Sequence, residues 1–280
     1  MRGLREFWFV FSRRRVAVLG FAILAGVMLC AVLGPLLTPY GPWQLAGPPL
    51  LWPATDARFP LGTDVLGRDI LSGLLNGAWV SLSIGVAATS ASLLIGLTVG
   101  SVSGYFGGRV GDALMRFTEI FQTIPSFLLI LIIVGIFSPS LGHIIVAIAV
   151  STWPSVARMV RAEFLSLRER EYVQSCVVLG MSAPRILITQ ILPNSLAPIL
   201  TISSVMVATA ILNEASLSFL GLGDPNMMSW GTMISIGRNS LRTAWYIAAV
   251  PGIAIILTVL ALNLVGEGLN DALNPRLRSE

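Results

Sequence analysis

Residues 168–198 read REREYVQSCVVLGMSAPRILITQILPNSLAP, the longest polar stretch with a helical pattern in a mostly apolar chain. In the first part of this stretch, Val173, Val177 and Gly180 fall on one face of a helix. Gly180 can adopt the positive φ that ends a helix, and Pro184 suits the first turn of a second helix, predicted over residues 184–192. This second helix should end at Pro193, since the residue before a proline is biased away from helix. The stretch therefore predicts a rigid helix–turn–helix between two hydrophobic spans, either a knob that docks on a soluble partner or an ordinary helical hairpin.

The composition is that of an integral membrane protein. Of 280 residues, 55% are hydrophobic and 11% charged, and the mean hydropathy is +0.81. All eighteen basic residues are arginine, and the lack of lysine excludes a nucleotide-binding P-loop and Schiff-base chemistry. The net charge of +4 indicates orientation in a membrane rather than nucleic-acid binding, because the arginines cluster beside apolar spans. Cys30 and Cys176 lie in an apolar span and in the polar stretch, so we expect no disulfide.

Six apolar runs are predicted to cross a hydrocarbon core about 30 Å thick. They occupy residues 16–37, 80–106, 119–137, 143–159, 196–222 and 244–265. The first run is too long for a signal peptide and no small-x-small cleavage site follows it, so we expect an uncleaved helix. Residues 107–117 read as a short polar turn, and Pro125 and Pro154 as interruptions of the third and fourth runs.

The distribution of arginine predicts the orientation. With the N-terminus inside, fourteen of the eighteen arginines lie in the cytoplasm, in residues 1–15, 107–117, 158–195 and 266–280. The predicted fold is therefore an all-α integral membrane protein with six transmembrane helices, N-in and C-in. We expect residues 1–79 to form an N-terminal tail, the first helix and a long external loop. Residues 80–280 should form a core of five helices with a cytoplasmic loop at 163–195.

The external loop carries PLGTDVLGRDILS from residue 60 onward. Thr63 or Asp64 is predicted to cap a short helix. Its apolar face would hold Leu66, Ile70 and Leu74. Two roles for Asp64, Arg68 and Asp69 are equally supported: contact with an extracytoplasmic binding protein, or a structural cap on the helix bundle.

A stripe of small residues marks the second apolar run. It recurs every four residues, at Ala88, Ser92, Gly96, Gly100 and Gly104. In lipid such a stripe indicates close helix–helix contact. We therefore expect packing here, including packing with a partner subunit, and no substrate site.

Asn213 and Glu214 interrupt the fifth apolar run. An acid inside a span costs about 2.5–3.5 kcal/mol on insertion scales, so it normally faces the bundle interior or water. Both residues are therefore candidates for lining a translocation path; the alternative is a charge near the outer interface that a neighbouring helix satisfies. His143, the only histidine, has no second histidine or cysteine beside it and reads as an interfacial side chain rather than a metal ligand.

Several of these segments together resemble one family. Gly180, followed thirteen residues later by Pro193 with Leu192 before it, resembles the "EAA" loop of ABC-importer permease subunits. Where that loop usually has Glu-Ala-Ala, this chain has Gln174, Ser175 and Cys176. The PLGTD segment, LSFLGLG at 217–223 and the tail from residue 263 are similar to the branch that carries dipeptides, oligopeptides and nickel. The resemblance therefore covers nearly the whole chain.

The resemblance implies a type I importer permease fold and a non-catalytic, C-type subunit in the bacterial cytoplasmic membrane. It implies docking on an ATPase by Glu171, Gln174, Ser175, Cys176, Gly180, Pro184, Leu192 and Pro193. Two cytoplasmic ATPase subunits would hold ATP and Mg²⁺, while this chain would bind no cofactor or metal. A second permease subunit of different sequence, an extracytoplasmic substrate-binding protein and membrane lipid would be its other partners. The expected solute is a peptide, with a nickel chelate or glutathione as alternatives.

The sequence also bears on three other classes of protein. An ATP-independent secondary transporter usually has inverted repeats and several intramembrane ionisable groups, and neither is evident. An intramembrane hydrolase needs a nucleophile with a base, but the chain has one histidine and no Gly-x-Ser-x-Gly elbow. A purely structural membrane subunit remains an alternative, because the sequence of a permease subunit also shows no active role.

Overall fold

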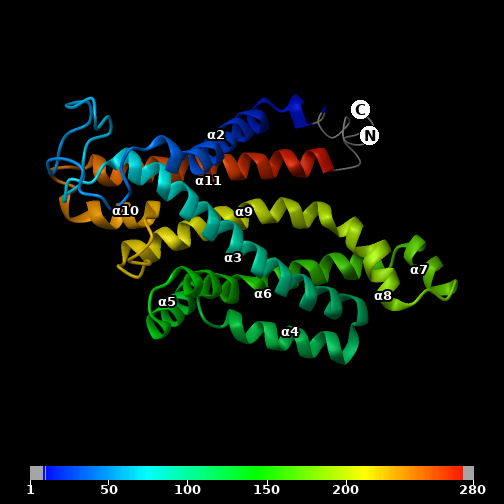
Figure 1. Ribbon diagram of the computed structural model, residues 1–280. Helices are drawn as coiled ribbons and strands as arrows, with labels where there is room; N and C mark the ends of the chain where they lie inside the picture. Colours follow the sequence, from blue (N-terminus) through cyan, green and yellow to red (C-terminus); the bar gives the residue numbers. More distant parts are fainter. Residues whose placement is uncertain (1–8, 10, 274–280) are drawn as a thin grey trace.

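The computed structural model describes residue 9 and residues 11–273, and it consists almost entirely of helices (Figure 1). Four arginines used in the topology prediction, Arg2, Arg5, Arg276 and Arg278, lie outside the described residues, as does the end of the family-like tail. The helices are α2 (Arg15–Leu37), α3 (Ile70–Phe106), α4 (Gly108–Gln122), α5 (Ser126–Phe137), α6 (Leu141–Arg168), α7 (Glu171–Val178), α8 (Ala183–Ile186), a π-helical turn (Leu187–Ile191), α9 (Leu192–Phe219), α10 (Trp230–Gly237), a 3₁₀ turn (Arg238–Ser240) and α11 (Tyr246–Leu273).

The candidate membrane spans agree with the sequence. Among the described residues, five helical segments are long and apolar enough to span a bilayer; α4 and α5, bent by 75° at a short break, bring the number to six when they are counted as one broken span. The break falls at Thr123–Pro125, and Pro125 immediately precedes α5, as its predicted kink requires. The prediction of an all-α membrane protein is confirmed.

Two predicted boundaries near the second span are wrong. Residues 107–117 are not a turn, because they begin the helix α4, whose charged residues lie on one face and whose apolar residues lie on others. The helix α3 starts at Ile70, ten residues before the predicted span, and crosses the predicted boundary between residues 79 and 80. Its cap is Asp69, and neither Thr63 nor Asp64.

The central stretch also differs from its prediction. Its second helix does not end at Pro193, because α8 passes through the π-helical turn directly into α9. Pro193 lies in the first turn of α9, where a missing backbone N–H costs little. The helix α6 likewise continues through Pro154 as far as Arg168.

The small-residue stripe of α3 packs against α6 of the same chain. A Cβ added at Gly96 would lie 2.5 Å from the Val156 Cβ, and one at Gly100 would lie 2.6 Å from the Ala157 carbonyl oxygen. The hydroxyl of Ser92 donates to the carbonyl of Ala149 at 3.3 Å. The predicted packing role is therefore confirmed, and the contact lies within the chain.

The two ends of the bundle carry different features (Figure 1). The helices α2 and α11 run side by side, and the Arg14 guanidinium lies 2.6 Å from the Asp271 carboxylate where α2 begins and α11 ends. The helices α7 and α8 lie at this same end, whereas the loop before α3 and the helix α10 lie at the opposite end. This arrangement agrees with a topology in which both termini and the central stretch share the cytoplasmic side.

Candidate functional site

The turn between α7 and α8 lies at the cytoplasmic end of the bundle, and buried side chains of α7 and α8 hold it against α6. Val173 of α7 is fully buried in a cluster with Phe164 of α6 and Ile186 of α8. Gly180 has φ +78°, and the following residue, Met181, donates its N–H to the Cys176 carbonyl at 3.1 Å. The predicted left-handed end of the first helix is therefore present.

Two large apolar residues of this segment are almost fully exposed. Val178 is 86% exposed and Leu179 is 80% exposed, and we call this pair the docking tip. Neither residue was singled out from the sequence, because a helical pattern does not show which of its apolar positions lacks a neighbour. An apolar tip at the end of an anchored helix is suited to insertion into a groove on another protein.

The predicted docking residues lie in α7, in α8, at the turn between them and at the start of α9. Glu171, Gln174, Ser175, Gly180, Pro184 and Pro193 are exposed, whereas Cys176 and Leu192 are half-buried. The Gln174 amide donates to the Arg168 carbonyl at 2.9 Å, and the Ser175 hydroxyl donates to the Glu171 carbonyl at 2.9 Å. Gln174 therefore ties α7 to the end of α6.

Glu214 is buried between α9 and α10, with 2% of its surface exposed. Its Oε1 accepts hydrogen bonds from the hydroxyls of Ser218 at 2.7 Å and Ser229 at 2.6 Å. Ser229 in turn caps α10, accepting the Thr232 N–H at 3.0 Å. Within the described residues Oε2 has no hydrogen-bond partner. Glu214 therefore fastens α10 onto α9.

The helix α10 is held on its other side by Trp230, its first residue. Its backbone N–H donates to the Ser81 hydroxyl at 3.1 Å, and its indole Nε1 donates to the Leu74 carbonyl at 2.9 Å. Gly231 follows, and a Cβ there would lie 2.6 Å from the Ala215 Cα. The pair therefore gives a close, hydrogen-bonded contact of α10 with both α3 and α9.

Asn213 differs from its neighbour Glu214 because it is half-exposed. The adjacent residues Leu212 and Ser216 line an open groove of about 570 Å³ between α9 and α11, near the outer end of the bundle. The groove is mainly apolar, with Phe219 and Ile256 also in its wall. The two candidate path residues therefore differ in exposure, since Asn213 is half-exposed and Glu214 is buried against α10.

The three charged residues of the external loop point inward, and each is at most 7% exposed. Asp64 accepts the backbone N–H groups of Leu66 and Arg68, and its Oδ2 lies 2.5 Å from the Arg68 Nε. The Arg68 guanidinium also lies over the Trp43 ring, 5.2 Å from its centroid. Asp69 caps α3 by accepting the Ser72 N–H at 2.9 Å. These contacts favour the structural role over direct contact with a partner.

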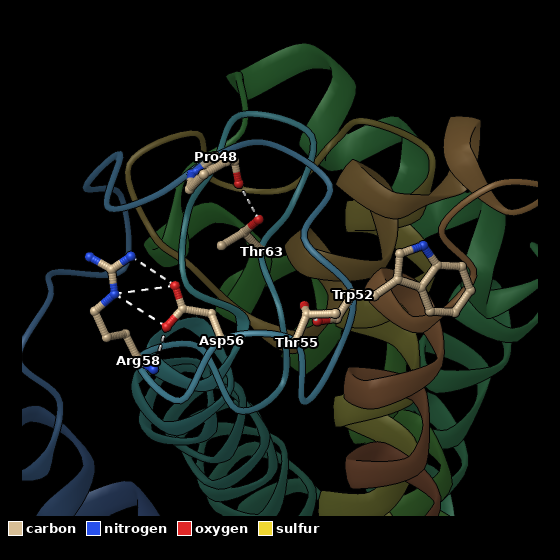
Figure 2. Close-up of polar contacts among 6 residues, drawn as sticks. All are labelled: Pro48, Trp52, Thr55, Asp56, Arg58 and Thr63. Carbon is tan, nitrogen blue, oxygen red and sulfur yellow. Dashed lines mark hydrogen bonds and ion pairs between the residues drawn. The ribbon is translucent and has the colours of Figure 1, made fainter.

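Figure 2 shows how the rest of this loop is held together. The Thr63 hydroxyl donates to the Pro48 carbonyl at 2.5 Å and accepts the Leu51 N–H at 2.9 Å. At the loop surface, the Arg58 guanidinium hydrogen-bonds Asp56 at 2.8 Å and holds the pKa of that carboxyl below its usual value. The loop is therefore a compact, internally bonded cap rather than a flexible linker.

His143 lies at the start of α6. Its Nδ1 is 2.9 Å from the Ser140 hydroxyl oxygen and 3.0 Å from the Ser138 carbonyl oxygen. Within residue 9 and residues 11–273, no group of three or more histidine, cysteine or acidic side chains is placed to hold a metal ion.

Two family models match the chain. The binding-protein-dependent transport system inner membrane component matches residues 96–279, and the N-terminal transmembrane domain of oligopeptide transport permease C matches residues 4–53.

Curated relatives match over nearly the full length. The di/tripeptide transport system permease protein DppC of Pseudomonas aeruginosa is 38% identical over 99% of this chain and 93% of its own length. The glutathione transport system permease protein GsiD of Pectobacterium atrosepticum is 36% identical over 98% of this chain and 92% of its own length.

A solved structure shares the fold. One chain of the MetNI methionine ABC transporter, in an inward-facing conformation, superposes with a TM-score of 0.60. The match covers 72% of this chain and 96% of that chain, at 19% sequence identity.

Proposed function

This chain belongs to the family of binding-protein-dependent inner-membrane transport components, and from this membership we propose that it forms half of the path by which an ATP-driven importer carries small peptides into the cytoplasm. As a family member it is a multi-pass inner-membrane permease subunit and not itself an enzyme. The observation that carries the peptide assignment is full-length similarity to a di/tripeptide permease. Glutathione, itself a tripeptide, is the second candidate because a glutathione permease is nearly as similar.

We propose that the docking tip inserts into a cleft of a cytoplasmic ATPase subunit. The support is its exposed apolar surface on an anchored helix, with Glu171, Ser175 and Pro184 exposed around it. Two such ATPase subunits would bind ATP and Mg²⁺, and closure of their dimer would move the tip. Since α8 continues into α9 without a loop, a push at the tip reaches a transmembrane helix directly.

A second permease subunit of different sequence would complete the path. On this chain we propose that Asn213 lines the outer part of the path, and that Glu214 reaches it only if α10 moves away from α9. We also propose a division of the chain into two parts at the start of α3; the separate matches of the two family models, to residues 4–53 and 96–279, support a division.

An extracytoplasmic binding protein would dock at the opposite end of the bundle. There, Asp64, Arg68 and Asp69 would act indirectly by fixing the shape of the external loop. The side chains that this loop exposes to a partner include Trp43, Leu45 and Leu66. Aromatic and aliphatic side chains on a rigid support are typical anchors of a protein interface.

Purification of the tagged chain in mild detergent tests the assignment. We expect an ATPase subunit and a second permease to copurify. Replacing Leu179 with aspartate should remove the ATPase and retain the second permease, because it places a charge on the docking tip. Recovery of the chain alone, in a detergent that preserves other importers, would contradict the proposed function.

A further inference from the structure

The exposed face of α6 is polar where a lipid-facing helix would be apolar. The helix α11, for comparison, exposes Ile253, Ile256 and Leu260. In the middle of α6, Thr152 is half-exposed, and Ser155 and Arg158 are exposed. The large apolar residues that α6 exposes, Val146 and Leu165, lie toward its two ends. Because a charged side chain is costly in hydrocarbon, this face must meet water or protein.

One side of this face borders a charged groove between α4 and α6. The groove has a volume of about 340 Å³. It is lined by Met115, Glu119, Arg158, Arg161, Ala162 and Leu165. Arg161 is already engaged, since it donates to the Gly111 carbonyl and to Asp112, both at 3.2 Å. Glu119 and Arg158 are exposed, and no ion pair involves either of them in the part of the chain that the structure describes.

Both unpaired charges lie about three turns along their helices from the cytoplasmic end of the bundle. Glu119 lies eleven residues beyond Gly108, the first residue of α4, and Arg158 lies ten residues before Arg168, the last of α6. At 1.5 Å per residue these separations are about 15–17 Å along each helix. The start of α4 and the end of α6 lie at the same end of the bundle (Figure 1), where the Arg168 guanidinium donates to the Tyr105 carbonyl just before α4 at 2.7 Å.

On its other side, the polar face of α6 borders a cavity of about 200 Å³ between α3, α6 and α9. Its polar lining consists of hydroxyls: Thr89, Thr152, Ser155 and Thr209. Thr89 is 4% exposed, and its hydroxyl has no hydrogen-bond partner among the described residues. Hydroxyls that line a cavity offer donors and acceptors for peptide groups or water. The hydroxyl-lined cavity and the charged groove thus lie on either side of the polar face of α6, which Thr152, Ser155 and Arg158 form and which we call the polar strip.

We infer that this strip is the wall of the inner half of the translocation path, where Arg158 attracts the carboxylates and Glu119 the ammonium groups of a passing peptide. The inference rests on the proposed function, because a short peptide carries both charges at its termini. Two unpaired side chains of opposite sign beside one groove match that charge pattern. This role also explains why neither charge is paired within the described part of the chain.

The test uses the complete importer, with its binding protein, in lipid vesicles. Uptake is measured for dialanine, for a dipeptide with a glutamate side chain and for one with a lysine side chain. Arg158→Gln should lower uptake of the glutamate peptide about fivefold relative to the lysine peptide, and Glu119→Gln should do the reverse, as expected when about 1 kcal/mol of charge attraction is lost. Arg242→Gln, at an exposed arginine near the opposite end of the chain's fold, should leave the ratio unchanged.

The outcomes separate the possible roles. Equal loss for all three peptides, or no loss, would overturn the inference while wild-type uptake still supports the proposed function. Loss of the second permease from the purified Arg158→Gln or Glu119→Gln complex would show a subunit interface and would also overturn it. Absence of peptide uptake by the wild-type importer would instead overturn the proposed function.

Discussion

At the scale of single residues, Glu214 shows how a buried acid can be structural. Two serine hydroxyls donate to one of its oxygens, and one of them belongs to the residue that caps α10. The carboxylate therefore couples the position of α10 to α9. The sequence indicates that the acid faces the protein interior, but Ser229 lies fifteen residues away beyond a turn, so its partner could not be predicted.

Replacing Glu214 with alanine should destabilise the protein by about 1–3 kcal/mol, because two buried hydroxyls lose their acceptor. Glu214→Gln should cost less, since its amide oxygen can still accept. Thermal unfolding in detergent, followed by tryptophan fluorescence, measures both variants. An unchanged melting temperature for Glu214→Ala would contradict the proposed fastening of α10.

Gly180 supports a second residue-scale prediction. It adopts a positive φ in open space, so a valine there suffers backbone strain of about 1–3 kcal/mol without a clash. Gly180→Val should reorient the docking tip and lower peptide uptake per ATP about tenfold in the reconstituted importer, while the chain still inserts.

Gly221 provides the matched control for this variant. It too has a positive φ and open space around it, but it follows α9 at the opposite end of the bundle. Gly221→Val should lower stability by a similar amount and leave the ratio of uptake to ATP hydrolysis unchanged. Unchanged coupling in Gly180→Val would count against the central stretch as the ATPase contact.

At the scale of elements, the apolar spans were predictable and the amphipathic ones were not. A long hydrophobic run such as α2 or α11 has one interpretation in a membrane protein. The helix α4 was misread as a turn because Arg109, Asp112 and Arg116 dominate a short window, although they share one helical face. The run from α8 to α9 was misread because a π-helical turn admits Pro193 without ending the helix.

At the scale of elements, two glycine-to-alanine substitutions should change the free energy of unfolding in opposite directions, because one glycine lies where α3 packs on α6 and the other does not. Gly100→Ala should destabilise by about 1–3 kcal/mol, because the added Cβ meets the Ala157 carbonyl at 2.6 Å. Gly135→Ala in α5 has open space around it and should stabilise by up to about 1 kcal/mol through helix propensity. Melting temperatures of the two variants check both signs, and a tolerated Gly100→Ala would contradict the close packing of α3 on α6.

At the scale of the whole molecule, the arginine distribution, the family motifs and the arrangement of the helices agree. The charged groove could not be predicted from the sequence, because Glu119 and Arg158 lie on separate helices. Only the packing of α4 beside α6 brings both residues to one groove. The burial of Asp64, Arg68 and Asp69 was equally hidden, since exposed and buried charges look alike in sequence.

The most direct test of the central claim is ATP-dependent uptake of a labelled dipeptide by vesicles. One set contains this chain with its second permease, ATPases and binding protein, and the other contains this chain alone. As an importer permease subunit, it should support accumulation only in the complete set and only with ATP. Accumulation by this chain alone, driven by an ion gradient without ATP, would contradict the assignment and identify a secondary transporter.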